Sequence, residues 1–355
     1  MGLRSLKFIS AAALLLVSAG VAEVSAQEPR RPAPPAPAAT PAPFPIPTNR
    51  FPRISRGGVP QPPFLPADTE LRTAADPNVN VKFCVAEGSV KINGGESDEV
   101  RAFVKNGRKF SIKILERDAK TSRANWVWLA PENAENVTMG PSAQCLSGDS
   151  IEIDLPVGAS VDIEGRSTDV HIDSIKKIRA KIVEGNIALN NISGGINATA
   201  MQGDLLVEAS AGAISLESTT GNIVANDVSP GQIGDLFRAK TSSGAITLQQ
   251  VSHRQIEANS ITGSVIFDGG FLTGGIYNLK TSNGSIILLI PDKASCKITA
   301  TYGFGSFNTD LPLKFIYQNE NTQAKNLAAT LGNGEACNLT LNTVSGSISL
   351  GKQKE

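Results

Sequence analysis

Side chains able to do acid–base or metal chemistry are few in this chain. Its 355 residues include two histidines, His171 and His253, and their spacing suggests no Ser-His-Asp arrangement. A polysaccharide lyase would instead need acidic calcium ligands and a base gathered on one outer sheet. Candidate carboxylates exist but do not recur at a regular period; they are Asp169, Asp173, Asp204, Asp227, Asp235 and Asp268. We therefore expect solvated outer-face and corner residues, no catalytic residue, and no metal or other cofactor.

Nucleotide and nucleic-acid binding are disfavoured by the glycine motifs and the charge. No Gly-x-x-x-x-Gly-Lys-(Ser/Thr) loop occurs, and the glycine-rich phrases open strands rather than helices. The whole chain is neutral, with 33 basic and 33 acidic residues. Residues 1–66 hold seven Lys or Arg and two Glu, so residues 67–355 carry a net charge of −5. An acidic body with 5% aromatic residues is not expected to bind nucleic acid.

The four cysteines predict covalent cross-links. An even number of cysteines in an exported chain suggests two disulfides, and four cysteines allow three connectivities. Proximity along the chain favours Cys84 with Cys145 and Cys296 with Cys337. A metal site is the alternative, but the chain has no Cys-x-x-Cys pair to support it.

A repeated glycine phrase predicts the elements that position all these residues. The phrase is Gly-x-(Ile/Leu)-x-(Leu/Ala/Val), and it first recurs every nine residues and then at wider intervals. Its glycines are Gly185, Gly194, Gly203, Gly212 and Gly221, followed by Gly244, Gly263, Gly284 and Gly346. A short fixed period with alternating apolar residues is typical of a solenoid of short β-strands.

The period also predicts how one coil is built. The second and fourth residues after each glycine share one strand face, and in this chain both are apolar. Nine residues suit a strand of about five residues and a tight corner at which glycine tolerates a positive φ. Two such units make a coil, so glycines 18 residues apart, such as Gly185 and Gly203, should stack. We expect an all-β parallel β-helix or β-solenoid with coils of about 18–23 residues. A β-sandwich of hairpins would not explain the strict register.

The N-terminus predicts export. Arg4 and Lys7 precede an apolar run, and Ala26 ends a small-residue cleavage site, so residues 1–26 resemble a signal peptide. Residues 27–75 begin with a stretch that holds 14 of the 21 prolines and predict a linker without a core. Residues 76–352 are then one solenoid domain. No later stretch could cross a bilayer, so we expect a protein of the periplasm, cell surface or extracellular space.

The segments before and after the coils suggest caps. Asn106-Gly107 predicts a β-hairpin, and Trp126 and Trp128 share one strand face, which predicts a hydrophobic plug over the first coil. Stacking of these tryptophans on a sugar is the alternative. Residues 302–333 predict an atypical cap or an inserted hairpin, and a binding site is the second interpretation. The aromatic residues concerned are Tyr302, Phe304, Phe307, Phe315 and Tyr317.

Several phrases together resemble a known family. They are GSVKI from Gly88, DLPVGASVDI, YNLKTSNGSIIL and the closing TVSGSISL. They are similar to the bacterial putative-adhesin family of LiaG-like domains of unknown function, over residues 79–350. The resemblance implies an exported β-solenoid associated with the bacterial envelope. Its motifs are structural, so it supplies no catalytic residue.

Two functions are compatible with these observations. The first is a non-enzymatic module of the cell envelope or surface, an adhesin or scaffold that presents a polar Ser/Thr/Asn face to an envelope component or a glycan. The second is a carbohydrate-active enzyme, a polysaccharide lyase or hydrolase built on a β-helix. We expect the first, because the sequence shows no periodic cluster of carboxylates.

Overall fold

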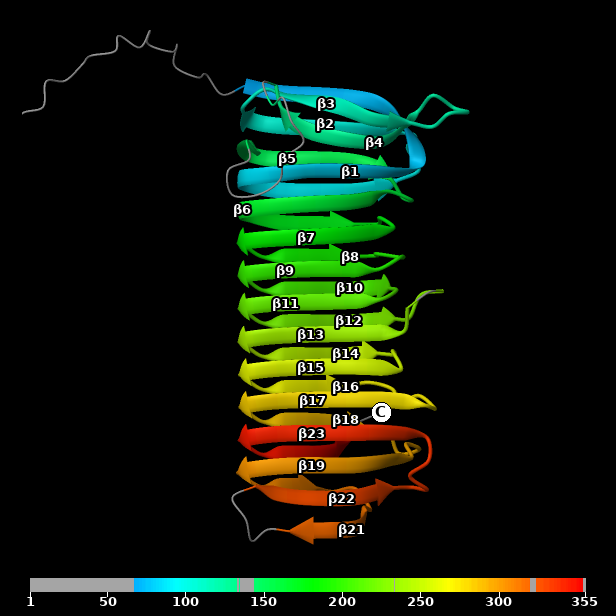
Figure 1. The fold of residues 1–355 in the computed structure, drawn as a ribbon, viewed down its shortest axis with the longest axis vertical. Helices are drawn as coiled ribbons and strands as arrows, with labels where there is room; N and C mark the ends of the chain where they lie inside the picture. The colour runs from blue at the N-terminus through cyan, green and yellow to red at the C-terminus, as the bar shows by residue number, and fades with distance from the viewer. Residues whose placement is uncertain (1–66, 133, 135–143, 233, 320–323, 354–355) are drawn as a thin grey trace, which may run out of the picture. The chain divides into compact units, whose positions relative to one another are not determined.

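The computed structural model describes residues 67–132, 134, 144–232, 234–319 and 324–353, which form an all-β stack (Figure 1). The expected signal peptide and residues 27–66 of the linker lie outside the described residues. In the regular part each strand pairs in parallel with the strand two places further along the chain, as β9 (Ile196–Gln202) does with β11 (Ile214–Thr220) and β10 (Leu205–Ala211) with β12 (Ile223–Ser229). The predicted coil of two strands is therefore confirmed.

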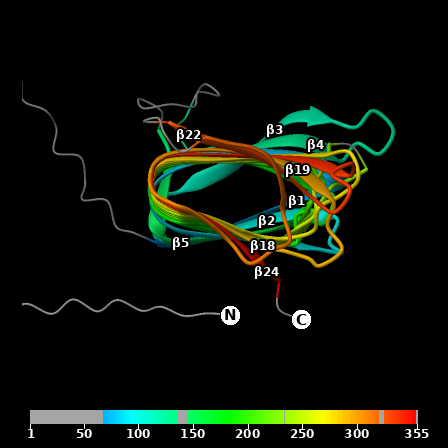
Figure 2. The ribbon, with the colours of Figure 1, turned by 90° about the horizontal axis from the view of Figure 1, so that it is seen from below.

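The coils form a front sheet and a back sheet that enclose the core (Figure 2). The regular strands of the front sheet are β7 (Lys177–Glu184), β9 (Ile196–Gln202), β11 (Ile214–Thr220), β13 (Leu236–Ser243), β15 (Gln255–Thr262), β17 (Gly275–Asn283), β23 (Cys337–Ser345) and β19 (Cys296–Phe304). Those of the back sheet are β8 (Ile187–Asn190), β10 (Leu205–Ala211), β12 (Ile223–Ser229), β14 (Ile246–Val251), β16 (Val265–Asp268), β18 (Ile286–Ile290), β24 (Ile348–Lys352) and β20 (Phe307–Thr309).

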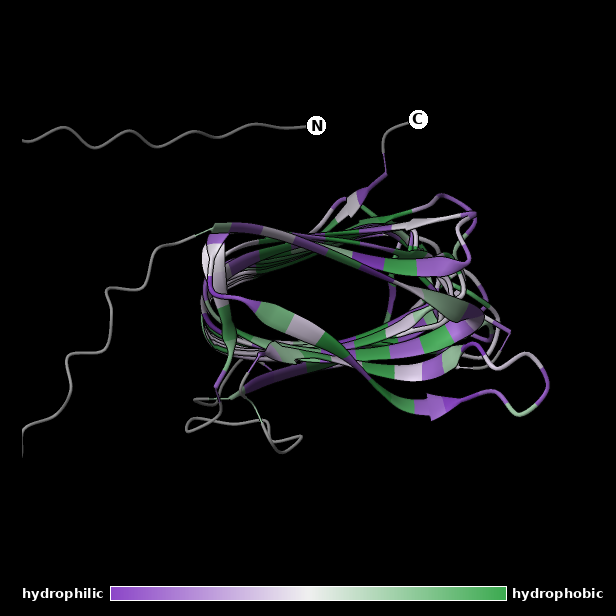
Figure 3. Ribbon diagram, turned by 90° about the horizontal axis from the view of Figure 1, so that it is seen from above, coloured by the Kyte–Doolittle hydropathy of each residue, from purple (hydrophilic) through white to green (hydrophobic). Residues whose placement is uncertain are grey.

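The apolar positions of the repeat make the core. Every second and fourth residue after a repeat glycine is buried, from Ile187 and Leu189 to Ile348 and Leu350. Hydropathy alternates along the strands (Figure 3). Ile214, for example, lies in register between Ile196 of the preceding coil and Phe237 of the next. Burying one such side chain contributes about 1.5–3 kcal/mol, and the contacts come from neighbouring coils, so stability resides in the stack.

One edge of the stack is a column of glycines. A Cβ atom on Gly203 would lie 2.0 Å from the carbonyl oxygen of Gly185, and one on Gly221 would lie 2.0 Å from that of Gly203. Both residues also have positive φ, 147° and 153°. Glycine is required here for space and for conformation. The predicted stacking of glycines 18 residues apart is confirmed.

The solenoid starts earlier than its composition indicates. Strand β1 (Ala67–Gly95) begins inside the expected linker, so the boundary at residue 75 is wrong. Residues 67–74 pair antiparallel with β2 (Glu99–Gly107), and Ala75 is already buried. The reason is that backbone pairing to β2, rather than a run of apolar side chains, orders this segment.

The predicted hairpin at Asn106-Gly107 does not form. Strand β2 pairs with β1 and β5 (Leu146–Pro156), whereas β3 (Phe110–Arg117) pairs with β4 (Ala124–Pro131). Gly107 is packed where a Cβ atom would lie 2.5 Å from the Ser147 carbonyl oxygen. The Asn106-Gly107 corner therefore connects β2, which pairs with β1 and β5, to β3, which pairs with β4. Strands β1 and β6 (Ser160–Asp173) then connect this end to the regular coils.

The last coil of the chain is not the last coil of the stack. Strand β23 pairs with β17 on one side and with β19 on the other, so Cys337–Lys352 lies between two earlier coils (Figure 1). The glycine column confirms the order, because Gly346 lies against the carbonyl of Gly284, and Gly305 against that of Gly346. The sequence predicts that the repeat returns at Gly346, but it does not predict that this coil lies between two earlier ones.

The end of the stack is made by the segment expected as a cap. Strand β22 (Lys325–Leu331) pairs antiparallel with β19, and β21 (Lys314–Asn319) pairs antiparallel with β22. Among the described residues β21 has no partner on its other side. The parallel coils thus end in an antiparallel pair of strands.

Candidate binding surface

Two of the candidate carboxylates belong to a series of hydrogen bonds that joins neighbouring coils at one corner. The N–H of Asn186 donates to Asp169 Oδ1 at 2.8 Å, and the N–H of Asp204 donates to Asn186 Oδ1 at 2.9 Å. The N–H of Asn222 then donates to Asp204 Oδ1 at 2.7 Å. We call Asp169, Asn186, Asp204 and Asn222 the corner ladder. Asp169 and Asp204 therefore do align across coils, contrary to the expectation, but their role there is to join coils.

The remaining carboxylates are dispersed. Asp173 Oδ1 accepts from Asn191 at 2.9 Å, Asp235 Oδ1 from the N–H of Arg254 at 2.7 Å, and Asp268 Oδ1 from Gln353 at 2.8 Å. Asp227 lies within β12 and has a positive φ of 51°. In the part of the chain that the structure describes, no three His, Cys, Asp or Glu side chains are placed to hold a metal ion.

Buried hydroxyls form a second set of links that sequence reasoning missed. Each donates to the carbonyl oxygen of a glycine in the column, as Thr241 does to Gly221 at 2.9 Å and Thr281 to Gly263 at 2.8 Å. The signal was available, because each hydroxyl residue stands three places before a corner glycine of its own coil. The set within the regular coils is Ser218, Thr241, Ser260, Thr281 and Thr343.

The two histidines lie on different coils. His171 is exposed on the outer side of β6. His253 is fully buried, with Nε2 2.8 Å from the carbonyl oxygen of Gly212 and its ring 5.7 Å from that of Phe237. Its Nδ1 has no hydrogen-bond partner among the described residues. Burial lowers the pKa of His253 below its usual value, which keeps the imidazole neutral at physiological pH.

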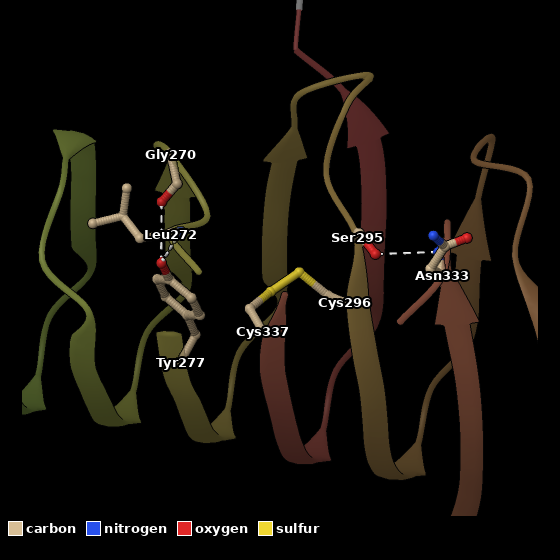
Figure 4. Close-up of a disulfide and its surroundings, with 7 residues drawn as sticks. All are labelled: Gly270, Leu272, Tyr277, Ser295, Cys296, Asn333 and Cys337. Atoms are coloured by element: carbon tan, nitrogen blue, oxygen red, sulfur yellow. Dashed lines mark hydrogen bonds between the residues drawn. A yellow bond between two sulfur atoms is a disulfide. The ribbon is translucent and has the colours of Figure 1, made fainter. Parts of the chain in front are cut away.

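Both disulfides join the pairs favoured by proximity along the chain. Cys84 is bonded to Cys145, and Cys296 to Cys337. The second disulfide links β19 to the inserted strand β23, next to the buried Tyr277, whose hydroxyl accepts from the N–H of Leu272 at 2.7 Å (Figure 4). Disulfides are typical of oxidising compartments, so the protein has the features of an extracytoplasmic one. The described residues contain no helix long and apolar enough to span a bilayer.

The structure divides the five aromatic residues of the cap segment. Tyr302 is buried in the core, and Phe307 is half-buried, with its ring 6.2 Å from that of Tyr302. Phe304, Phe315 and Tyr317 are exposed. Phe315 still touches Phe307, at a ring separation of 6.5 Å. The segment thus closes the end of the core through Tyr302 and Phe307 and leaves the other three rings on the surface.

The tryptophans do not plug the first coil. Val127 and Leu129 supply the core side of β4, so Trp126 and Trp128 lie on its outer side. Trp128 is 2% exposed and forms a separate cluster with Ala130 and Ala134, while Trp126 is 41% exposed. The plug prediction is wrong because β4 joins the front sheet beside β1 instead of crossing the end of the stack.

The exposed Trp126 borders a groove of about 600 Å³ on the front sheet. Two rows of outward side chains cross the strands there. The groove residues in the first row are Trp126, Asn80, Ser160 and Lys177, and those in the second row are Lys82, Asp162, Arg179 and Asn197. We call these eight residues the Trp126 groove.

The Trp126 groove is positively charged on an acidic body. It holds three cations, Lys82, Lys177 and Arg179, and one carboxylate, Asp162, which gives a net charge of +2. Within the described residues none of the three cations has a hydrogen bond or ion pair from its side chain. Trp126 stands out in the sequence but the cations do not, because Lys82 and Lys177 are about 95 residues apart and only the register aligns their strands.

The expectation of a polar outer face holds for the central row of the front sheet but not for the corresponding row of the back sheet. On the front sheet a central row is polar and consists of Asn197, Ser215, Arg238, Glu257, Asn278 and Thr340. On the back sheet the corresponding row is mainly aliphatic and consists of Ala188, Leu206, Val224, Thr247, Ile266 and Ile287. The back sheet differs because the third residue after each repeat glycine points outward, and in back-sheet strands that residue is often apolar.

Comparisons with known proteins give little beyond this geometry. No family model matches the chain, and no curated protein matches it. Among solved structures it is similar to the crystal structure of a putative cell adhesion protein from Clostridium sporogenes. The two share 13% sequence identity, the match covers 81% of this chain and 100% of the other, and the TM-score is 0.25.

Proposed function

We propose that this chain is an exported, non-catalytic β-solenoid module of the bacterial cell envelope that binds or scaffolds an envelope component or a glycan. The proposal rests mainly on one observation: the polar side chains at the corners form hydrogen bonds that hold neighbouring coils together. Asp169 and Asp204 accept backbone N–H groups in the corner ladder, and the buried hydroxyls cap glycine carbonyls. These groups serve the stack, and what remains for recognition is the outer surface.

Three observations support the location and the role. The two disulfides suit an oxidising compartment. The N-terminal sequence has the pattern of a signal peptide followed by a proline-rich spacer. The resemblance to LiaG-like domains points to the same compartment. Coils joined by backbone pairing and by side-chain hydrogen bonds form a firm support for a surface that binds a partner.

Co-sedimentation tests the proposal. The purified protein is mixed with insoluble envelope material from a bacterium that exports it, and the pellet and supernatant are analysed for protein and for soluble sugar. We expect the protein in the pellet and no sugar released. Protein that stays in the supernatant, or that releases oligosaccharides, would contradict the proposal.

A further inference from the structure

We propose that the Trp126 groove binds an acidic saccharide, with a sugar ring stacked on the Trp126 indole and its carboxylates paired with Lys177, Lys82 and Arg179. This inference rests on the proposed function, since it names the ligand class of a binding module. Its starting point is Trp126, which is 41% exposed on a face where the neighbouring strands present hydrophilic side chains. A large exposed ring beside polar groups is a feature of recognition sites.

The neighbours of Trp126 match the chemistry of a sugar. Asn80 and Ser160 lie in register with it on the next two strands and supply an amide and a hydroxyl for sugar hydroxyl groups. An indole face gives an apolar surface against which the C–H side of a pyranose ring can stack. The groove thus offers one flat apolar contact and several dispersed hydrogen-bonding groups, which a peptide or a lipid chain would not match equally well.

The charges select an acidic sugar over a neutral one. Lys177 ends the row that begins with Trp126, and Lys82 and Arg179 lie in the adjacent row. Arg179 carries the planar fork that pairs two N–H groups with one carboxylate. The local net charge of +2, against −5 for residues 67–355, attracts an anion to this place on the surface.

The register defines how a polymer would lie. The row from Trp126 to Lys177 crosses three strand spacings of about 4.8 Å, roughly 14 Å in all, which suits a short oligosaccharide rather than one ring. The second row continues from Arg179 to Asn197 and Ser215 along the front sheet. The sugar chain therefore runs across the strands, along the stack, and meets further polar side chains beyond the groove.

Titration of the full purified protein with polygalacturonate tests the assignment, with its methyl ester as the uncharged matched polymer and hyaluronate as a second acidic one. The chain has two tryptophans, so a change in emission is assigned to Trp126 by comparing the parent with Trp126→Phe. We expect both acidic polymers to bind and to change the emission. The ester should bind about tenfold more weakly, because it lacks the ionised carboxylates.

Variants locate the site. Trp126→Ala should weaken binding, measured by calorimetry, by about tenfold, and Trp126→Phe should retain part of the affinity because a ring remains. Arg179→Gln should weaken binding of the acidic polymer by about three- to tenfold but leave binding of the ester unchanged. Lys280→Gln, an exposed cation on β17 of the same sheet, is the matched control and should bind as the parent does.

Several outcomes would overturn the proposal. They are the absence of binding to both acidic polymers, equal binding of the ester, or unchanged affinity in Trp126→Ala. Single-stranded DNA bound as tightly as polygalacturonate would show a general polyanion surface instead. If Trp126→Ala still binds envelope material as the parent does, the groove assignment fails while the module stands. If the polymer is bound at the groove and cut, the proposed function fails while the groove stands.

Discussion

At the scale of single residues, buried hydroxyl groups donate hydrogen bonds to the carbonyl oxygens of the corner glycines. A corner glycine brings a carbonyl into the interior, where an unpaired polar group costs about 1–3 kcal/mol. Thr281 and Thr343 remove that cost for Gly263 and Gly284 by donating a hydroxyl at 2.8 and 2.9 Å. At each such corner glycine leaves room for the neighbouring coil, and a hydroxyl from the next coil forms the hydrogen bond that the glycine carbonyl needs.

Burial at one repeat position can be tested with a pair of neighbouring substitutions. Ile214→Asp would place an unpaired charge between Ile196 and Phe237 and should cost several kcal/mol. Ser215→Asp, one residue on and on the outer side, should cost less than about 0.5 kcal/mol. The free energy of unfolding in urea measures both. Equal values for the two variants would contradict the register.

The buried histidine predicts a pH dependence. Desolvation lowers the pKa of His253 in the folded state below the value near 6.5 that it has when unfolded. The unfolded chain therefore takes up the proton first as the pH falls, and stability decreases from about pH 6.5 downward. Thermal unfolding between about pH 8 and pH 5 should show this loss, and His253→Gln should reduce its slope. An equal slope in the parent and in His253→Gln would exclude His253 as its source.

At the scale of elements, local pattern predicted strands well and pairing poorly. The strands from Ile187 to Ser229 follow from glycine spacing and alternation, because each signal lies within nine residues. The Asn106-Gly107 hairpin was mispredicted because the corner is local but the partners, β1 and β5, are chosen by distant segments. The cations of the Trp126 groove were missed for the same reason. Lys82 on β1 and the two cations on β7 come together across β6 only after the register is set.

The corner itself predicts a sharp contrast between two glycines. Gly221→Ala would bring a Cβ atom to 2.0 Å from the Gly203 carbonyl oxygen at a φ of 153°, so it should lower the melting temperature markedly. Gly270→Ala meets nothing within 4 Å of its Cβ atom and should be tolerated. Differential scanning calorimetry compares the two. A tolerated Gly221→Ala would mean that the coils do not stack through this edge.

At the scale of the whole stack, the inserted C-terminal coil makes the fold depend on its last residues. No sequence signal predicts the insertion, because the phrase at Gly346 has the same form as the phrases of coils that follow chain order. Once β23 lies between β17 and β19, each of those strands depends on it for one row of hydrogen bonds. An end coil would carry only one such interface.

Removing that coil should therefore have a large effect. Deletion of residues 337–355 leaves β17 and β19 without the strand between them and also removes the Cys296–Cys337 disulfide. We expect the C-terminal half of the truncated chain to unfold without cooperativity, so its backbone amides should lose their protection from hydrogen exchange. Hydrogen exchange measured residue by residue shows this loss. Cys337→Ala in the intact chain removes only the disulfide, and the backbone amides of this variant should remain protected from hydrogen exchange. Similar protection in the truncated and the intact chain would contradict an internal position for the coil.

If the protein binds polysaccharides without cleaving them, the polymers must keep their length in its presence. The purified protein is incubated with polygalacturonate and with envelope polysaccharides, with and without calcium, and the length distribution of each polymer is determined afterwards. A binding module leaves every distribution unchanged, including that of a polymer that it holds. Calcium-dependent shortening with unsaturated ends, lost in Asp204→Asn, which keeps the corner-ladder acceptor but removes the charge, would contradict the account and make the protein a lyase.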